Sequence, residues 1–210
     1  IRTLFCPLSA DPSYSAVGRQ VSYFLAAHVP GGMVLRSQTM SEQPDAFDPN
    51  SLAERSGADH ILTGSVDVSD GFEVTLTLVR CTDQRVILER RFAEGNDNYQ
   101  SVLTCAIEEI IGCLAIPPAE QVSELPQAFD AFLDYMEAMD LKLSMQHGIR
   151  NDKSQRAFSL LLEVLERDPQ FETAINELAV LSLLWISKSL GQTEVVLNPL
   201  KVVRQRFPQN

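Results

Sequence analysis

Apolar residues in the first part of the chain follow two patterns, short runs and helical spacing. Residues 2–8 form a short apolar run that ends in turn residues, which predicts a buried strand. From residue 16 to residue 28, apolar side chains recur every three or four positions, and the proline and glycines at residues 30–32 end this predicted helix. Residues 33–35 predict a second strand.

Strict alternation of apolar and polar residues is clearest between residues 60 and 92. After a predicted short helix over residues 52–56, residues 60–68 and 72–78 alternate, and Asp70-Gly71 between them supplies a tight hairpin turn. Residues 85–92 alternate again. Three consecutive strands of period two predict an antiparallel meander with one buried and one solvated face.

An amphipathic helix is predicted over residues 98–114, and Pro117-Pro118 ends it. We expect the following side chains to face the sheet: Val102, Cys105, Ile107, Ile110, Ile111 and Leu114. The element order is then strand-helix-strand-helix-strand-strand-strand-helix, which fits one domain of ordinary size.

Beyond residue 125 every apolar pattern has helical spacing. Four helices are predicted, over residues 129–143, 157–165, 175–186 and 195–207. Pro169 and Pro208 follow the second and fourth of them in the same way, which indicates a repeated helix pair.

Together these patterns predict an α+β chain with two parts. Residues 1–117 form a small α/β domain with a mixed sheet, residues 118–125 a linker, and residues 126–210 about two helical repeats.

Charge and composition narrow the class of partner. The chain has 17 basic and 28 acidic residues and a net charge of −11. Binding to phosphate backbones relies on basic side chains that release counterions, so we expect no direct contact with nucleic acid. No run of about 18 apolar residues occurs, so we expect no membrane insertion.

No catalytic or metal-binding pattern is present in the sequence. It contains no Gly-rich phosphate loop, nucleophile elbow or paired zinc-ligand motif. The three histidines and four cysteines are widely spread, and we expect the thiols to be reduced. We therefore expect a non-enzymatic protein with no cofactor, no metal and no catalytic residue.

The first part resembles the TolB-like amino-terminal α/β domain of bacterial regulators. The residues that carry the resemblance are 4–8 (LFCPL), 56–66 (SGADHILTGSV), 74–79 (VTLTLV) and 87–92 (ILERRF), followed by 131–138 (AFLDYMEA) at the junction. The first helix departs from the family, because this chain has Gly18-Arg19-Gln20-Val21 where the family often has an acidic segment.

The second part resembles tetratricopeptide repeats. Counted back from Pro169, Ala157 falls on the small position where two helices touch, and Leu161 and Val164 fill core positions. Leu178-Ala179 falls on the Leu-Gly/Ala pair of the next helix. A small side chain is needed there because a large one would hold the helices apart.

These resemblances imply the sensory or interaction part of a larger signalling protein. Relatives join this unit to a class III adenylate cyclase or to an OmpR-type DNA-binding domain, as in acid-sensing and invasion-gene regulators. We therefore expect a regulatory protein-interaction module, with a small-molecule sensor as the alternative. The expected location is the cytoplasm, with the periplasm as the alternative. Because the chain begins at Ile1 without a signal-peptide pattern, we expect a fragment or processed product.

A partner segment would contact the first helix of each predicted pair. The candidate partner-binding residues are Phe132, Tyr135, Met139, Thr173, Asn176 and Val180. The competing interpretation is that these side chains pack against further repeats or the α/β domain. Since two repeats are fewer than are usually stable alone, we also expect residues 195–207 to contact a missing neighbour or a second copy of the chain.

Overall fold

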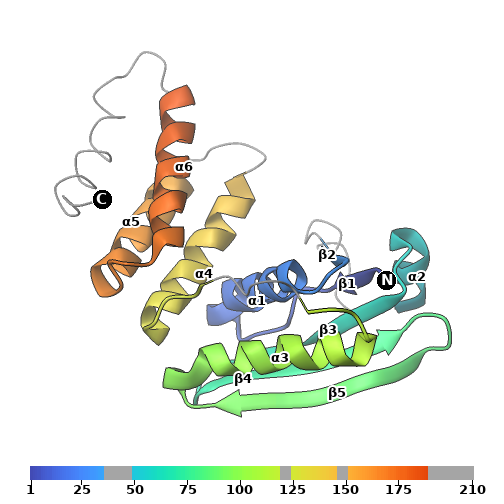
Figure 1. Cartoon of the computed structure of the whole chain (residues 1–210). Coiled ribbons are helices and arrows are strands. Elements are labelled where there is room, and N and C mark those ends of the chain that lie inside the picture. The colour runs from blue at the N-terminus through green and yellow to red at the C-terminus, as the bar shows by residue number, and fades with distance from the viewer. Residues whose placement is uncertain (36–48, 119–123, 146–150, 189–210) are drawn as a thin grey trace. The chain divides into compact units, whose positions relative to one another are not determined.

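The computed structural model describes residues 1–35, 49–118, 124–145 and 151–188. It divides the chain into two compact units, Ile1–Ser123 and Glu124–Asn210. The predicted linker, residues 118–125, spans this division. A mixed sheet with helices in one unit and helices in the other confirm the predicted α+β class (Figure 1).

The first unit contains the element order that the sequence predicts. Its strands are β1 (Thr3–Phe5), β2 (Gly32–Val34), β3 (His60–Asp67), β4 (Phe72–Arg80) and β5 (Arg85–Glu94). Its α-helices are α1 (Ser15–His28), α2 (Pro49–Ser56) and α3 (Tyr99–Leu114). The strands form one sheet in the order β2-β1-β3-β4-β5, in which β1 pairs parallel with β2 and β3, and the other pairs are antiparallel.

The predicted first strand is longer than the observed one. β1 ends at Phe5, although the chain continues along β3, where the backbone N–H groups of Cys6 and Ser9 donate to Leu62 and Gly64 at 2.9 and 3.0 Å. Pro7 lies between these two donors and has no N–H group, so the ladder cannot be continuous there.

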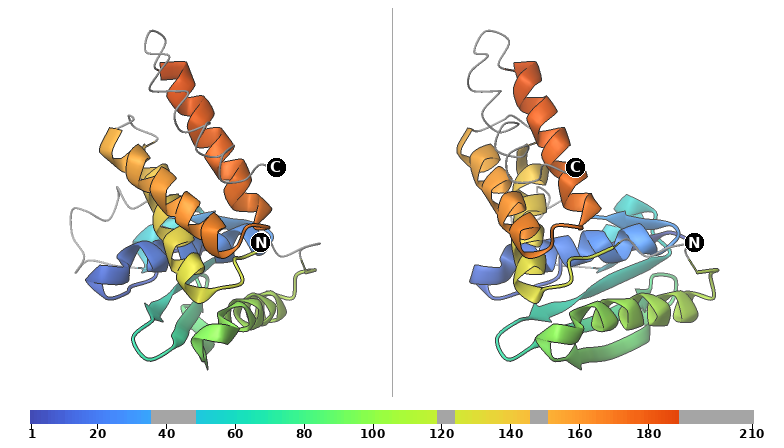
Figure 2. Two further views of the ribbon diagram at one scale, coloured as in Figure 1. Left: turned by 90° about the vertical axis from the view of Figure 1, so that its left-hand side faces the viewer. Right: turned by 60° about the vertical axis from the view of Figure 1, so that its left-hand side comes forward.

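Two helices cover one face of the sheet and one helix covers part of the other. α1 and α3 lie side by side against the face that carries Phe5, Leu62 and Leu76 (Figure 2). On the other side, Leu52 of α2 packs against a small cluster with Leu4 and Ile61. The rest of that second face, over β3–β5, carries half-buried polar side chains such as Thr63, Thr75 and Thr77. This is the solvated face that the alternating pattern predicts.

α3 ends at Leu114 as predicted, but its buried face differs from the prediction. The helix stops at Leu114, before the two prolines, because Ala115 adopts a left-handed conformation (φ 51°) and its N–H bonds back to Ile111 and Gly112. Cys105 is exposed, so the expectation that it faces the sheet was wrong. One turn further on, Glu108 and Glu109 flank the same solvent-facing side, and the buried side is filled by larger apolar residues.

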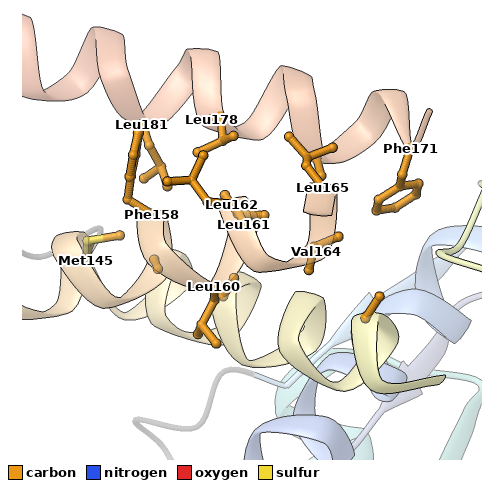
Figure 3. Packing of buried hydrophobic residues seen from close by; sticks show 14 residues of the cluster. Met145, Phe158, Leu160, Leu161, Leu162, Val164, Leu165, Phe171, Leu178 and Leu181 are labelled. Carbon is orange, nitrogen blue, oxygen red and sulfur yellow. The ribbon is translucent and has the colours of Figure 1, made fainter. Parts of the chain in front are cut away.

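The second unit contains three described helices, α4 (Phe129–Ser144), α5 (Asn151–Arg167) and α6 (Glu172–Lys188). α5 presents apolar side chains to both neighbours: Leu160 and Val164 lie on the side of α4, whereas Phe158 and Leu162 face Leu178 and Leu181 of α6 (Figure 3). α5 begins at Asn151, six residues before the predicted start of this helix at residue 157. The predicted helix over residues 195–207 lies outside the described residues.

The predicted close approach at Ala179 was also wrong. Ala179 is exposed, whereas Ala157 and Ala174 are fully buried. α6 directs Leu178 and Leu181 towards α5, and Ala179 lies one helical step away from that face. The small residue that allows close contact on α6 is therefore Ala174.

Candidate functional site

The six predicted partner-binding residues occupy very different environments. Phe132 is fully buried, and its ring stacks on that of Phe129 with centroids 6.0 Å apart. Tyr135 and Met139 are half-buried and pack against the apolar cluster of the helical unit. The other three lie on α6. Thr173 is half-buried, whereas Asn176 and Val180 are exposed.

The surroundings of Tyr135 indicate a role in packing the helices. Its ring meets Phe171 edge-to-face at 5.1 Å, and burial together with nearby Glu177 raises the pKa of its hydroxyl above the usual value. Glu177 is itself paired with Lys142 of α4. A neutral tyrosine held in this way packs the helices together. A role for it in binding a partner remains a prediction.

Exposed residues on α6 form a narrow strip, which we call the α6 stripe: Asn176, Ala179, Val180 and Leu183. Val180 is 42% exposed and Leu183 is 63% exposed. Residues spaced by three, four and seven positions lie on the same side of a helix, so the four side chains are neighbours. The stripe extends the predicted pair Asn176 and Val180 by one further turn. The apolar run from Leu178 in the sequence contains Leu183, but the run alone does not show which of its residues are exposed.

Three of the four cysteines in the first unit are poorly suited to nucleophilic chemistry. All four cysteines are free thiols in the structure. Burial raises the pKa of Cys6 to about 12 and also raises the pKa of Cys81 and of Cys113. Because the thiolate is the reactive form, these three groups remain protonated at neutral pH. Among the described residues, no three histidine, cysteine or acidic side chains converge on a position for a metal ion.

The two described histidines lie at the ends of secondary-structure elements, one at the end of a helix and one at the start of a strand. His28 ends α1, where its Nδ1 lies 2.6 Å from the carbonyl oxygen of Phe24. His60 opens β3, and its buried Nδ1 has no hydrogen-bond partner among the described residues. Burial lowers the pKa of His60, against the opposing attraction of Asp59. His147 lies outside the described residues.

A hollow lies beside the loop between β1 and α1. It measures about 650 Å³ and is bordered by Ser9, Asp11 and Tyr14 on the loop and by Ser65 and Asp67 on β3. Asp67 accepts hydrogen bonds from the backbone N–H and the hydroxyl of Ser69, which lower its pKa. Both carboxylates of the hollow thus serve local turns, since Asp11 accepts from the N–H of Ser13.

A second, smaller hollow lies where β5 meets α3. It measures about 410 Å³ and is bordered by β5 from Arg90 to Glu94 and by Glu108 and Glu109 of α3. Arg90 pairs with Glu109 at 2.8 Å and lies over the ring of Phe92, with 5.6 Å from its guanidinium carbon to the ring centroid. The sequence alone does not indicate this hollow, because Arg90 and Glu109, which pair there, are far apart in the chain.

No family model and no curated protein matches the chain. Similar solved structures include TolB from Acinetobacter baumannii (16% identity, TM-score 0.40, 57% of this chain and 29% of that chain covered). They also include the PelC dodecamer from Paraburkholderia phytofirmans (16%, 0.39, 55% and 88%) and lipoprotein GNA1162 from Neisseria meningitidis (17%, 0.34, 54% and 96%). The chain thus spans less than a third of the TolB chain.

These similarities are low both in identity and in TM-score. They agree with the coarser part of the expected resemblance, a likeness to TolB. None of them supports tetratricopeptide repeats or an OmpR-type or cyclase context. In the part of the chain that the structure describes, no helix is both long and apolar enough to cross a bilayer.

Proposed function

We propose that the chain is a non-catalytic regulatory module of a larger bacterial signalling or transcription-regulating protein, and that it binds a protein segment through the α6 stripe. The observation that carries this proposal is the exposure of Val180 and Leu183 on the same side of α6. Exposed apolar side chains that adjoin one another, rather than lying singly, are typical of interaction sites.

The stripe has the shape and chemistry for an amphipathic helix. Ala179, Val180 and Leu183 offer apolar contact over about one turn, which suits apolar side chains spaced by three and four positions on the partner. Asn176 adds a side-chain amide that can donate and accept, and exposed Glu172 lies one turn before it. We therefore expect the partner helix to carry a basic residue beyond its apolar anchors.

The proposal also includes three expectations from the sequence: a tetratricopeptide-type arrangement, an attached output domain and a cytoplasmic location. A tetratricopeptide-type arrangement is supported by the burial of Ala157, Leu161 and Val164, which occupy the expected core positions of α5, and of Leu178 on α6. The attachment to a cyclase or DNA-binding output domain rests on the sequence resemblance alone. A cytoplasmic location is supported by the four free thiols, since disulfides are rare in that compartment.

Site-specific cross-linking in cells identifies the partner. A photoreactive amino acid at position 183 should capture the partner, whereas the same group at exposed Ser159 on α5 should not. The purified partner is then titrated with V180D/L183D and with Q155D/S159D. The second variant adds the same charge at exposed positions of α5 and is the matched control.

We expect V180D/L183D to weaken binding by at least about tenfold, because two apolar contacts are replaced by charges that must be desolvated. The control variant should bind as the unmodified chain does. Equal affinity of both double variants would show that the stripe is not the binding site.

The hollow of about 650 Å³ beside the β1–α1 loop favours one alternative, a small-ligand sensor. Its volume is in the range of small-molecule sites, and hydroxyls and carboxylates border it together with apolar side chains such as Val66 and Val68. A thermal-shift screen against metabolites and nucleotides tests it. A specific rise in melting temperature that D11N and D67N both abolish would favour the sensor over the interaction module.

A further inference from the structure

We propose that two copies of this chain associate by antiparallel pairing of their β5 strands about Arg90, so that the sheet continues from one copy into the other. The partner at this surface is a second copy of the same chain, and the surface is separate from the α6 stripe.

β5 is an open edge of the sheet. In the strand order β2-β1-β3-β4-β5 it is the last strand, and it is ten residues long, whereas β2 at the opposite edge has three. An edge strand presents unpaired N–H and C=O groups to another strand. Val86, near its start, is 48% exposed.

A bulge limits the straight part of this edge. Leu78 pairs with Leu88 and Val79 pairs with Val86, so Ile87 is an extra residue on β5. The regular stretch available for pairing therefore begins at Leu88. Glu89 and Arg91 lie on the solvated face of the sheet, opposite Thr77 and Thr75 of β4, whereas Leu88, Arg90 and Phe92 lie on the α3 side.

Charge favours a register about Arg90 over the two adjacent registers for self-pairing. A twofold axis perpendicular to the sheet places residues of the same face opposite one another. With the axis at Arg90, Glu89 of each copy lies opposite Arg91 of the other, and Leu88 lies opposite Phe92. An axis at Glu89 would oppose two glutamates, and an axis at Arg91 would oppose two arginines. Opposite charges stabilise such cross-strand pairs and like charges destabilise them.

The charged groups needed for this register are available at the edge. Within the described residues, Glu89 forms no ion pair or side-chain hydrogen bond. Arg91 binds Glu73 of its own sheet at 2.6 Å, and its side chain remains largely exposed. A guanidinium has five N–H donors, so Arg91 can bind a second carboxylate while it keeps Glu73.

The register also opposes the two copies of Arg90 across the axis. Each Arg90 is already paired with Glu109, and Glu108 borders the same hollow at the β5–α3 edge. Glu108 forms no ion pair in the described part of the chain. In the dimer, the four carboxylates of Glu108 and Glu109 therefore surround the two Arg90 guanidiniums. The summed charge of these side chains is already negative in each copy before the two copies pair.

Charged residues on an edge strand also serve to prevent pairing. Residues of one sign would suffice for that purpose, because two copies would then repel one another in every register. β5 instead alternates a glutamate with an arginine on its solvated face, and the two signs match when a second copy approaches antiparallel.

Reversing the charges of Glu89 and Arg91 distinguishes a strand edge whose charges favour pairing from one whose charges prevent it. The full chain is studied by sedimentation velocity over a wide concentration range, as wild type, E89R, R91E, the double variant E89R/R91E and an equimolar mixture of E89R with R91E. A short stretch of strand gives a weak dimer, so association should appear only at high concentration.

We expect each single variant to weaken dimerisation by about tenfold or more, because both symmetric contacts become repulsive. The mixture of the two single variants should recover dimers, since all Arg–Glu contacts re-form between unlike chains, and the double variant should dimerise as wild type does. Recovery in the mixture also shows that the single variants are folded.

Two results would overturn the proposal. One is a wild-type chain that remains monomeric at every concentration. The other is a dimer that E89R and R91E leave unchanged, which would place the contact on another surface, such as the α6 stripe.

Discussion

The sheet unit and the helical unit are each stabilised by a different kind of internal contact. In the sheet unit, main-chain groups approach one another closely: a Cβ atom at Gly64 would lie 1.9 Å from the carbonyl oxygen of Thr75. In the helical unit, contact is made by side chains, with α5 packed between the apolar residues of α4 and α6. The sheet unit is therefore sensitive to a single added carbon atom, and the helical unit to the volume of its side chains.

The two units also expose different chemistry. The open edge of the sheet is charged and self-complementary around Arg90, whereas the α6 stripe is mostly apolar. The first suits a weak, salt-dependent contact with a second copy, and the second suits a contact that removes apolar surface from water. One chain can thus use the two surfaces for two different partners.

Among the variants that test this comparison, we expect Gly64→Ala to have the largest effect on stability. The new methyl group would overlap the backbone of β4, which cannot move without breaking its pairing, so we expect a loss of about 3 kcal/mol or more in the free energy of unfolding. Urea denaturation followed by circular dichroism measures it. Gly95→Ala is the matched control, because nothing lies within 4 Å of its Cβ position. Equal stability of the two variants would show that Gly64 is not in close contact.

A smaller effect is expected from enlarging one of two alanines in the helical unit. Ala157 is fully buried, so A157L should overpack the α4–α5 contact and cost about 1–3 kcal/mol. Ala179 is exposed, so A179L should change stability by less than about 0.5 kcal/mol. The same denaturation experiment compares them. A larger loss of stability for A179L than for A157L would favour the close helix contact at Ala179 that the repeat pattern predicts and the structure does not show.

The smallest effect is expected from the pH dependence of the sheet unit. Burial lowers the pKa of His60 in the folded protein, so between that pKa and the unfolded value the unfolded chain binds more protons. The contribution of neutral His60 to stability is therefore complete above the unfolded pKa and is lost as pH falls through the folded pKa. H60Q should lose less stability than wild type when the pH is lowered from about 7.5 to 5. Identical profiles would contradict this assignment.

Much of the fold follows from periodicity alone. The strict alternation over β3, β4 and β5 predicted the meander, and the positive φ of Gly71 (141°) appears at the predicted Asp-Gly turn. The longer helices were predicted because an apolar face repeats every three or four residues, and among the described ones α1, α3, α4, α5 and α6 have a buried side in the structure.

The sequence could not show which surfaces stay open. A meander leaves either β3 or β5 at an edge, and only the parallel pairing of β1 with β3 decides that β5 is open. Likewise Ala157 on α5 and Ala179 on α6 both fit a helix contact by spacing, but only Ala157 is buried, whereas the rotation of α6 leaves Ala179 exposed. Such choices depend on tertiary packing, which a single element does not encode.

Hydrogen exchange of the chain with and without its cross-linked partner tests the central claim most directly, since one measurement covers all three candidate surfaces. The account predicts that the partner slows exchange in α6 (Glu172–Lys188) and leaves β5 (Arg85–Glu94) and residues 9–14 unchanged. Slower exchange at residues 9–14 and 65–69, with none in α6, would contradict the account and favour a site in the sheet unit.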